Sequence, residues 1–383
     1  MDSIKLIAAA TFGLEAIVKR ELINMGYDKL TVSDGAVEIE ADLKDVPRLN
    51  INLRSSDRVL LIVGRFKAFS FDELFEGTKA LPWGDIIPEN GHFIITGKSV
   101  KSTLYSVPDC QSIVEKAIVD KLKQKYNVNW FKKTGAVYKV QVSILKDVVT
   151  LTLDTTGAAL NKRGYRNNAV MAPLKETLAH ALVDLSYYRP DRILLDPCCG
   201  SGTIAIEAAL KAKNIAPGIS RKFVSEDWGI IDTAYWKKAR SAAFSAINVD
   251  LNPQIYASDI NPKAIEIAKS NAINAGVDDC IIFENKPLNK VRLPGNYGVC
   301  VCNPPYGERM GELDEVEQLY RDIGRLLRSD STWSVYIITS HEGFEQLYGI
   351  PLAKRRRMEI LIALMALEII FAFSYLGFII IPP

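Results

Sequence analysis

The chain has 383 residues, of which 48% are apolar and 24% are charged, and its formal net charge is +2. This length predicts two or three domains, and the composition is that of an ordinary globular protein. The nearly balanced charge excludes a strongly basic surface over the whole molecule, so any binding of nucleic acid has to use local patches.

The chain begins with two small α+β units. Residues 3–10 predict a strand, Gly13–Gly26 an amphipathic helix and residues 36–40 a second strand, which places a first unit at 1–64. A second unit follows at 65–160. Its expected elements are a strand, a helix and two strands around a Lys-Asp turn, at 92–96, 109–126, 139–145 and 148–154.

Two basic segments are candidates for contact with RNA. Lys98, Lys101 and Tyr105 lie among hydroxyl side chains after the strand at 92–96, and this mixture suits contacts to an RNA backbone. A solvated loop is the alternative interpretation.

The second basic segment contains Lys162, Arg163 and Arg166, in a linker and entry helix that we place at 161–190. These residues predict either RNA contact or an interdomain joint held by ion pairs.

A glycine-rich loop then follows the apolar strand Arg192–Asp196. The glycines allow a sharp turn and a close approach to a ligand, and an apolar helix begins just after them. A plain strand–helix turn is the alternative, and the lack of a Gly-Lys-Ser/Thr ending disfavours a phosphate-binding P-loop. The candidate cofactor residues here are Asp196, Cys198, Gly200, Ser201, Gly202 and Thr203.

The next two strands end in further candidates. Asp259 and Ile260 follow the strand at 254–258, and an acidic residue at this position can bind both ribose hydroxyls of a nucleoside. Asn285 follows the strand at 280–283 and is placed to contact an adenine.

The apolar run Tyr297–Cys302 leads into Asn303, Pro304, Pro305 and Tyr306. An amino group on a base is a weak nucleophile, and paired acceptors can aim its lone pair at an activated methyl group. The Asn303 side chain and the Pro304 carbonyl are those acceptors, the prolines stiffen the loop, and Tyr306 offers a face for stacking. A strand-ending turn is the alternative. Together with the upstream loops, the motif predicts an S-adenosylmethionine (SAM) methyltransferase acting on an exocyclic amino nitrogen.

The chain resembles a known family in motifs spread from residue 12 to about residue 348. These motifs are Phe12–Glu15, Asp154–Gly157, Lys162–Arg166, Ala172–Glu176, Asp196–Thr203, Asp259 and Asn303–Gly307. They are similar to those of the THUMP-containing class I RNA methyltransferases, particularly the group with the N-terminal half of the bacterial large-subunit rRNA guanine-N2 methyltransferase.

The resemblance implies an α/β fold with three parts: a ferredoxin-like unit at 1–64, a THUMP RNA-binding domain at 65–160 and a Rossmann-like SAM methyltransferase domain at 191–357. It also implies that Pro173 and Glu176 border the cofactor. The expected activity is formation of N2-methylguanine in 23S ribosomal RNA. An adenine-N6 DNA methyltransferase and an RNA-binding protein with an inactive methyltransferase domain are the alternatives.

The last residues depart from the family. A closing antiparallel hairpin is expected after residue 357, but 358–383 is an apolar stretch interrupted by Glu359 and Glu368. It is long enough to span a bilayer, although Glu368 near its middle argues against an anchor. A shifted reading frame or a divergent tail is the favoured interpretation, and it leaves the last strands of the sheet in doubt.

Cysteine and histidine usage completes the expectations. The six cysteines include no CxxC pair and suit a reducing cytosol, and the three histidines are too scattered for a metal site. Asp2 and Lys5 do not suit a signal peptide, so we expect a cytoplasmic protein without a metal.

Overall fold

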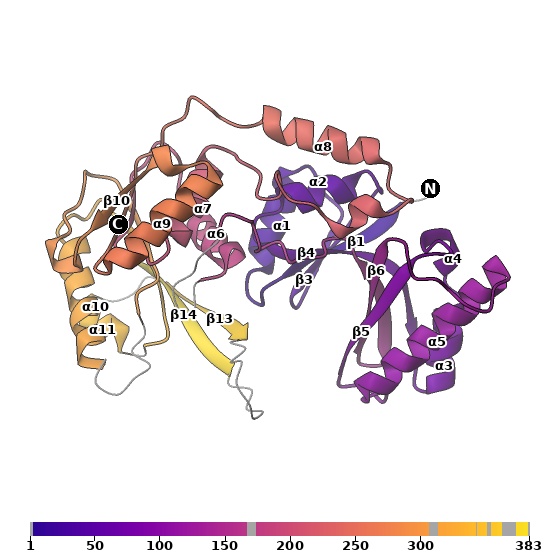
Figure 1. Cartoon of the computed structure of the whole chain (residues 1–383). Helices are drawn as coiled ribbons and strands as arrows, with labels where there is room; N and C mark the ends of the chain where they lie inside the picture. Colours follow the sequence, from indigo (N-terminus) through magenta and orange to yellow (C-terminus); the bar gives the residue numbers. More distant parts are fainter. Residues whose placement is uncertain are drawn as a thin grey trace.

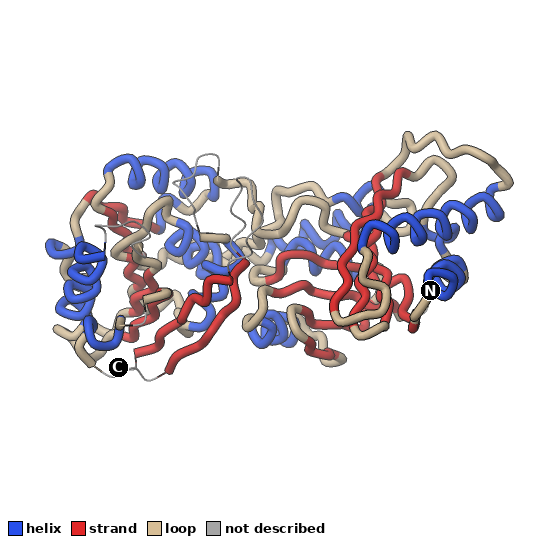
Figure 2. The backbone as a smooth tube through the Cα atoms, turned by 90° about the horizontal axis from the view of Figure 1, so that it is seen from below, coloured by secondary structure: helices blue, strands red, loops and turns tan. Residues whose placement is uncertain are grey.

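The computed structural model describes six stretches of the chain: 3–166, 174–305, 313–341, 343–350, 354–361 and 373–381. They form an elongated molecule with two halves, each built on its own sheet (Figures 1 and 2). We call residues 3–160 the N-terminal half and the stretches from residue 174 onward the methyltransferase half.

One seven-stranded sheet runs through the whole N-terminal half, in the order β2-β3-β1-β4-β7-β6-β5. Its strands are β1 Ile4–Ala10, β2 Leu30–Ser33, β3 Ala36–Ala41, β4 Ser56–Lys67, β5 His92–Val100, β6 Val137–Leu145 and β7 Val148–Asp154. The long strand β4 pairs with β1 on one side and with β7 on the other. The two units expected from the sequence therefore share one sheet, and residue 64 lies inside β4.

Five helices of this half flank the sheet: α1 Glu15–Asn24, α2 Asp45–Asn52, α3 Phe71–Lys79, α4 Trp83–Ile86 and α5 Val107–Tyr126. Side chains alternate along β6, and Val140, Val142 and Ile144 are buried. They belong to the same core as Val114 and Ile118 of α5. The core of these strands thus lies on the face that α3 and α5 cover.

β5 is longer than the sequence predicts. It pairs in parallel with β6 as far as Val100 and Leu145. Lys98 therefore lies within a strand rather than in the loop that follows it, because backbone pairing with β6 extends the strand beyond its apolar start. Lys101 and Tyr105 lie in the loop before α5.

The second sheet has the order β10-β9-β8-β11-β12-β14-β13, and its first five strands are parallel. They are β8 Leu194–Asp196, β9 Ile255–Asp259, β10 Ile281–Asn285, β11 Val299–Cys302 and β12 Ser334–Thr339. Helices cover both faces, so β11 is apolar and buried along its whole length. The helices on this sheet are α6 Glu176–Leu185, α7 Thr203–Ala212, α9 Pro262–Ala275, α10 Leu313–Leu327 and α11 Phe344–Tyr348. A further helix, α8 Thr233–Ser245, packs against the N-terminal half instead.

The apolar C-terminal stretch contributes to this sheet. β13 Lys354–Leu361 and β14 Phe373–Ile381 form an antiparallel hairpin, and β14 pairs antiparallel with β12. The doubt that the sequence raised about the last strands is therefore not supported, since aromatic and β-branched residues favour strand formation here. Among the described residues, no helix is long and apolar enough to cross a membrane.

A segment of the methyltransferase half reaches over the N-terminal sheet. We call residues 215–246, which lie in the sequence between α7 and β9, the bridging segment. Its helix α8 lies over α2 (Figure 1). Trp228 stacks on Tyr138 of β6 at 4.9 Å between ring centroids, and its indole N–H donates to the Val137 carbonyl at 2.9 Å. These contacts hold the two halves together.

Candidate active site

The glycine loop joins β8 to α7 in a conformation that requires glycine. Gly200 and Gly202 have φ values of 52° and 80°, which favour glycine over other residues. A Cβ on Gly202 would lie 3.0 Å from the Cβ of Ala268 and 3.3 Å from the ring of Phe283. The Cys199 amide donates to the Ser258 carbonyl at 2.9 Å, so the loop is also fixed to the neighbouring strand β9.

Asp259 ends β9 and contacts this loop directly. One carboxylate oxygen accepts from the Gly200 amide and the other from the Asn261 amide, both at 2.9 Å. Each oxygen has a further lone pair available for another donor. The two groups that the sequence assigned to the cofactor therefore lie side by side at the carboxyl edge of the sheet.

Asn285 supports the same edge from β10, where it pairs with Asp259 in the strand register. Its side-chain amide donates to the carbonyls of Asp259 and Ile260, both at 2.9 Å. Asn285 thus lies at the end of β10 rather than in a following loop. The Ile260 side chain is 71% exposed and is available to pack against a planar ligand.

Asp196 is the most unusual charged group of the site, because it is 0% exposed. One carboxyl oxygen accepts from the Cys198 amide at 3.4 Å, and the other is buried without a hydrogen-bond partner among the described residues. Burial, with a smaller contribution from the nearby charge of Asp259, raises the pKa of Asp196 to about 8. A buried carboxyl group without a donor fits a cationic or hydrogen-bond-donating ligand such as SAM.

The Asn-Pro-Pro segment follows β11, which lies between β8 and β12. Asn303 is half-buried, Pro304 is buried and Pro305 is exposed. The Tyr320 hydroxyl of α10 donates to the Pro305 carbonyl at 3.4 Å and contacts the Thr339 hydroxyl at 2.8 Å. The segment thus leaves the same edge of the sheet as Asp196, one strand away. Tyr306 lies outside the described residues.

The remaining predicted loop residues lie inside the loop. Ser201 and Thr203 are buried with their hydroxyls 3.4 Å apart, and Cys198 is half-buried. Burial raises the pKa of the Cys302 thiol, which is hydrogen-bonded to Cys198. These side chains therefore stabilise the loop in addition to any contact with a ligand.

The entry segment reaches the glycine loop through Arg166. Its guanidinium donates to the Thr203 hydroxyl at 2.8 Å and to the Leu174 carbonyl at 2.9 Å, and it lies 3.5 Å from the Glu176 carboxylate. Glu176 is buried at the start of α6, and burial raises its pKa. Arg166 thus links Glu176 to Thr203 at the start of α7, and the position of Glu176 beside the cofactor stays a prediction. Pro173 lies outside the described residues.

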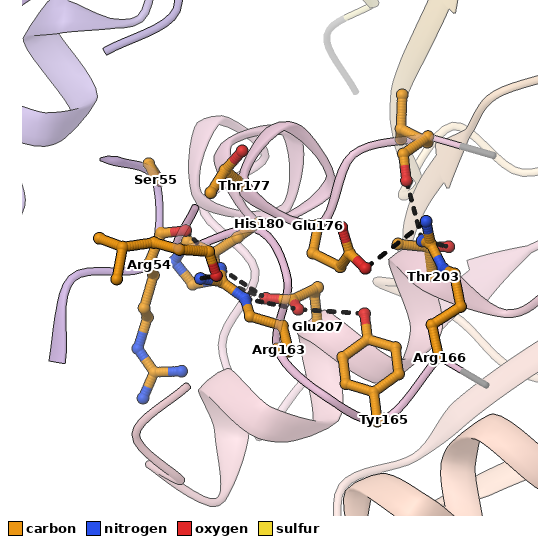
Figure 3. A network of polar contacts seen from close by, with 12 residues as sticks. Arg54, Ser55, Arg163, Tyr165, Arg166, Glu176, Thr177, His180, Thr203 and Glu207 are labelled. Atoms are coloured by element: carbon orange, nitrogen blue, oxygen red, sulfur yellow. Dashed lines mark hydrogen bonds and ion pairs between the residues drawn. The ribbon is translucent and has the colours of Figure 1, made fainter. Parts of the chain in front are cut away.

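Arg163 belongs to a buried network between the two halves (Figure 3). Its guanidinium donates to Glu207 of α7 at 3.3 Å and also to the Arg54 carbonyl of the N-terminal half. The Tyr165 hydroxyl donates to the same Glu207 carboxylate at 3.2 Å. Burial holds the pKa of His180 well below its ordinary value, so this histidine is neutral.

This burial changes the interpretation of the second basic segment. Arg163 is enclosed by protein and Arg166 is turned toward the glycine loop, so neither is available to RNA in this structure. Both charges are matched by carboxylates, of Glu207 for Arg163 and of Glu176 for Arg166. Arg163 also contacts the N-terminal half, which favours the interdomain alternative for that residue. Lys162 is exposed, as are Lys98, Lys101 and Tyr105 of the first segment.

Two supporting residues were missed from the sequence. The Asn271 side chain of α9 is buried and donates to the Ser201 carbonyl at 3.1 Å. Glu207 is the partner of Arg163, and a lone glutamate inside the apolar helix 204–210 was a signal that could have identified it. Among the described residues, no group of three His, Cys, Asp or Glu side chains could hold a metal ion.

Comparison with known families matches each part of the chain. An RlmL ferredoxin-like domain matches residues 5–60, a THUMP domain matches 68–154 and an RMKL-like methyltransferase domain matches 163–362. Together with a doubly wound sheet and its glycine loop, these matches define a class I methyltransferase whose cofactor is SAM. The fold class expected from the sequence is confirmed.

Individual relatives agree over nearly the whole length. "Putative RNA methyltransferase YpsC" of Bacillus subtilis (strain 168) is 51% identical over 94% of this chain and 93% of its own. A "predicted N6-adenine-specific DNA methylase" from Listeria monocytogenes is 48% identical, with a TM-score of 0.93 over 100% of this chain and 97% of that one. SMU.472, "a putative methyltransferase complexed with SAH", is 35% identical, with a TM-score of 0.91 over 100% and 98%. The chain belongs to the THUMP-containing family with an RMKL-like methyltransferase domain.

Proposed function

We propose that this chain is an RNA methyltransferase that forms N2-methylguanine in 23S ribosomal RNA. The observation that carries the proposal is the position of Asn303 and Pro304, which leave the sheet one strand from Asp196 and the glycine loop. This arrangement brings acceptors for an amino group to the edge where the cofactor binds. A ribosomal RNA substrate would place the enzyme in the cytoplasm.

The chemistry follows from the types of group at this edge. SAM, when bound, supplies a methyl group on a positively charged sulfur, so a strong base is not required. The Asn303 side-chain carbonyl and the Pro304 backbone carbonyl accept the amino N–H groups and hold the nitrogen lone pair toward that methyl. Transfer of that methyl group would form the N–C bond as the S–C bond breaks, and the nitrogen would then lose one proton to solvent.

The contacts made by Tyr320 support this role. A hydrogen bond from its hydroxyl fixes the Pro305 carbonyl, and Thr339 holds that hydroxyl in turn. Because the loop is already restrained, it loses little further conformational entropy when the target base binds. Asp259 is placed to hold the ribose of the cofactor through the lone pairs that the Gly200 and Asn261 amides leave available.

RNA is favoured over DNA because a THUMP domain forms one sheet with the first unit and is fixed to the catalytic half. The name of the Bacillus subtilis relative points to RNA as well, whereas that of the Listeria monocytogenes relative points to adenine in DNA. The Asn-Pro-Pro segment is compatible with either amine, so an adenine-N6 DNA methyltransferase is the second candidate. An inactive domain is disfavoured by the presence of Asp259 and Asn303.

The deciding experiment is transfer of a tritiated methyl group to undermodified 23S rRNA and, in parallel, to duplex DNA. We expect labelling of the RNA with N2-methylguanine as the product, and loss of that nucleoside from rRNA of a deletion strain. The Asn303→Ala variant is the matched control, since it should retain the cofactor. Preferential labelling of DNA with methyladenine as the product would favour the second candidate.

A further inference from the structure

The THUMP part of the N-terminal sheet has one face that its own helices leave open. Strands β4, β7, β6 and β5 bury Val140, Val142 and Ile144 against the side of α3 and α5. Successive side chains of a strand point to opposite faces, so the residues between these belong to the other face. In Figure 1, α3 and α5 lie on the side of these strands away from the methyltransferase half, so the open face is turned toward that half.

A polar row crosses this open face from one strand to the next. Lys98 of β5 pairs with Ser143 of β6, Ser143 with Thr150 of β7, and Thr150 with Arg65 of β4. Neighbouring strands are about 4.8 Å apart, so the row extends over roughly 14 Å. The Arg65 side chain donates to the Thr150 hydroxyl at 3.2 Å and forms an ion pair with Glu38 at 2.8 Å. Arg65 therefore fixes one end of the row, and the charge of Lys98 lies at the other end.

An apolar row with a basic end lies next to the polar one. Val100 and Leu145 are paired, and they are 49% and 53% exposed. Leu145 also pairs with Val148 of β7, which pairs with the exposed Lys67 of β4. The two adjacent aliphatic side chains and the lysine in the same row are thus accessible to a ligand at this end of the sheet.

The loop before α5 is fastened to the same end of the sheet. The Lys146 amide donates to the Val100 carbonyl at 3.2 Å, and the Thr103 amide donates to the Asp147 carboxylate at 2.6 Å. This loop carries Tyr105, which is 83% exposed. An exposed aromatic ring is thus carried by a loop that is fastened to this end of the sheet.

We propose that a single strand of RNA binds across this open face, with phosphates at Lys98 and Lys67 and with a ribose or base against Val100, Leu145 and Tyr105. The inference rests on the proposed RNA substrate and assigns it a path. Charge complementarity favours a polyanion, and an open sheet with exposed apolar groups suits an extended strand whose bases are unpaired. Hydroxyls of the polar row can donate to phosphate or ribose oxygens. An RNA strand that leaves this face toward the methyltransferase half approaches the Asn-Pro-Pro edge.

The test compares two pairs of lysine substitutions in the full-length protein. Lys67→Gln with Lys98→Gln removes both charges from the open face. Lys132→Gln with Lys133→Gln removes two exposed charges from the loop between α5 and β6, beyond the opposite end of α5. The measured quantities are the Kd for an unmodified 23S rRNA fragment at several salt concentrations, the KM and kcat for methyl transfer to it, and the Kd for SAM.

We expect the open-face pair to raise the Kd for RNA by about tenfold, and to reduce the slope of log K against log salt by about 1.4, at about 0.7 per phosphate contact of a single strand. The KM for RNA should rise while kcat at saturating RNA and the Kd for SAM stay unchanged. The matched pair in the loop should leave all four quantities unchanged.

Three outcomes would overturn the inference. If the wild-type protein binds RNA and the open-face pair binds it with the same Kd and salt slope, this path is wrong while an RNA substrate still stands. If the loop pair weakens binding as much as the open-face pair, the strand runs elsewhere on the domain. If the wild-type protein binds duplex DNA but no RNA, both this inference and the proposed function fail.

Discussion

The buried carboxyl group of Asp196 predicts a pH-dependent affinity for the cofactor. Because burial raises its pKa to about 8, the group is mostly neutral at pH 7 in the absence of a ligand. A cationic ligand favours the ionised form, so binding has to release a proton below that pKa. We therefore expect affinity for SAM to rise as the pH increases toward 8.

The magnitude follows from the size of the shift. At pH 6, two units below the pKa, about 1% of the carboxyl group is ionised, against about half at pH 8, so affinity should be lower at pH 6 by up to about fiftyfold. Asp196→Asn keeps the shape and the acceptor for the Cys198 amide but cannot ionise. The variant should lose most of this pH dependence. The α-amino group of the cofactor also titrates near pH 8, but it contributes equally to both proteins.

Calorimetry at pH 6, 7 and 8 measures this difference, and two buffers of different ionisation enthalpy count the released proton. Folding stability gives an independent check. Because the pKa of Asp196 is raised by folding, its contribution to stability is complete below the ordinary aspartate pKa near 3.8 and is lost as the pH rises toward 8. The ligand-free Asp196→Asn variant should therefore gain stability relative to the wild type as the pH increases. If the affinity for SAM changes with pH in the same way in the wild type and in Asp196→Asn, the reasoning is refuted.

Three further predictions concern the neighbouring groups. Asp259→Ala should weaken SAM binding by roughly 1.5–3 kcal/mol, or about tenfold or more, because it removes a charged acceptor; an unchanged Kd by calorimetry in the folded variant would contradict the assignment. Asn303→Ala should raise the methyl-transfer barrier by roughly 2–4 kcal/mol with near-normal SAM binding, and single-turnover rates would test this; wild-type rates would exclude the acceptor role. Glu207→Ala should lower the free energy of unfolding by roughly 3–5 kcal/mol, because it leaves the buried Arg163 guanidinium without its carboxylate; denaturant unfolding measures this, and a loss below about 1 kcal/mol would indicate that the network is dispensable.

Much of the candidate site at the carboxyl edge of the second sheet could be predicted, because the sequence patterns that indicate it are local. A glycine loop after a short apolar strand, an acid at the end of the next strand and Asn303 after a third each follow from residue type and order. The contact between Asp259 and the Gly200 amide agrees with that pattern. The parallel sheet supplies the rest, since it gathers the ends of its strands at one edge.

The residues that the sequence left open or placed differently depend on contacts between distant segments. A basic residue such as Arg163 suits RNA contact as well as an interdomain joint, and its partner Glu207 lies 44 positions further along the chain. Lys98 was placed in a loop because the apolar signal stops early, whereas pairing with β6 continues to Val100. Local propensity cannot report either effect, because both arise from tertiary partners.

For the C-terminal hairpin, the sequence led us to doubt strands that the structure contains. A departure from an expected motif favoured a shifted reading frame or a divergent tail and left the last strands in doubt, but β14 still pairs with β12 from Val335 to Thr339. Strand pairing accepts many apolar sequences, because backbone groups form the hydrogen bonds and side chains only have to suit a strand. An unusual sequence can therefore preserve the pairing.

The bridging segment has a consequence for how this protein can be divided. Phe223, Trp228 and Trp236 belong in sequence to the methyltransferase half, but they are buried in the core of the N-terminal half. Cutting the chain near residue 160 would expose three large aromatic rings on one product and remove part of the core from the other. A chimera that exchanges RNA-binding parts between relatives should therefore transfer residues 215–246 together with the N-terminal sheet. The natural unit of exchange in this chain is discontinuous in sequence.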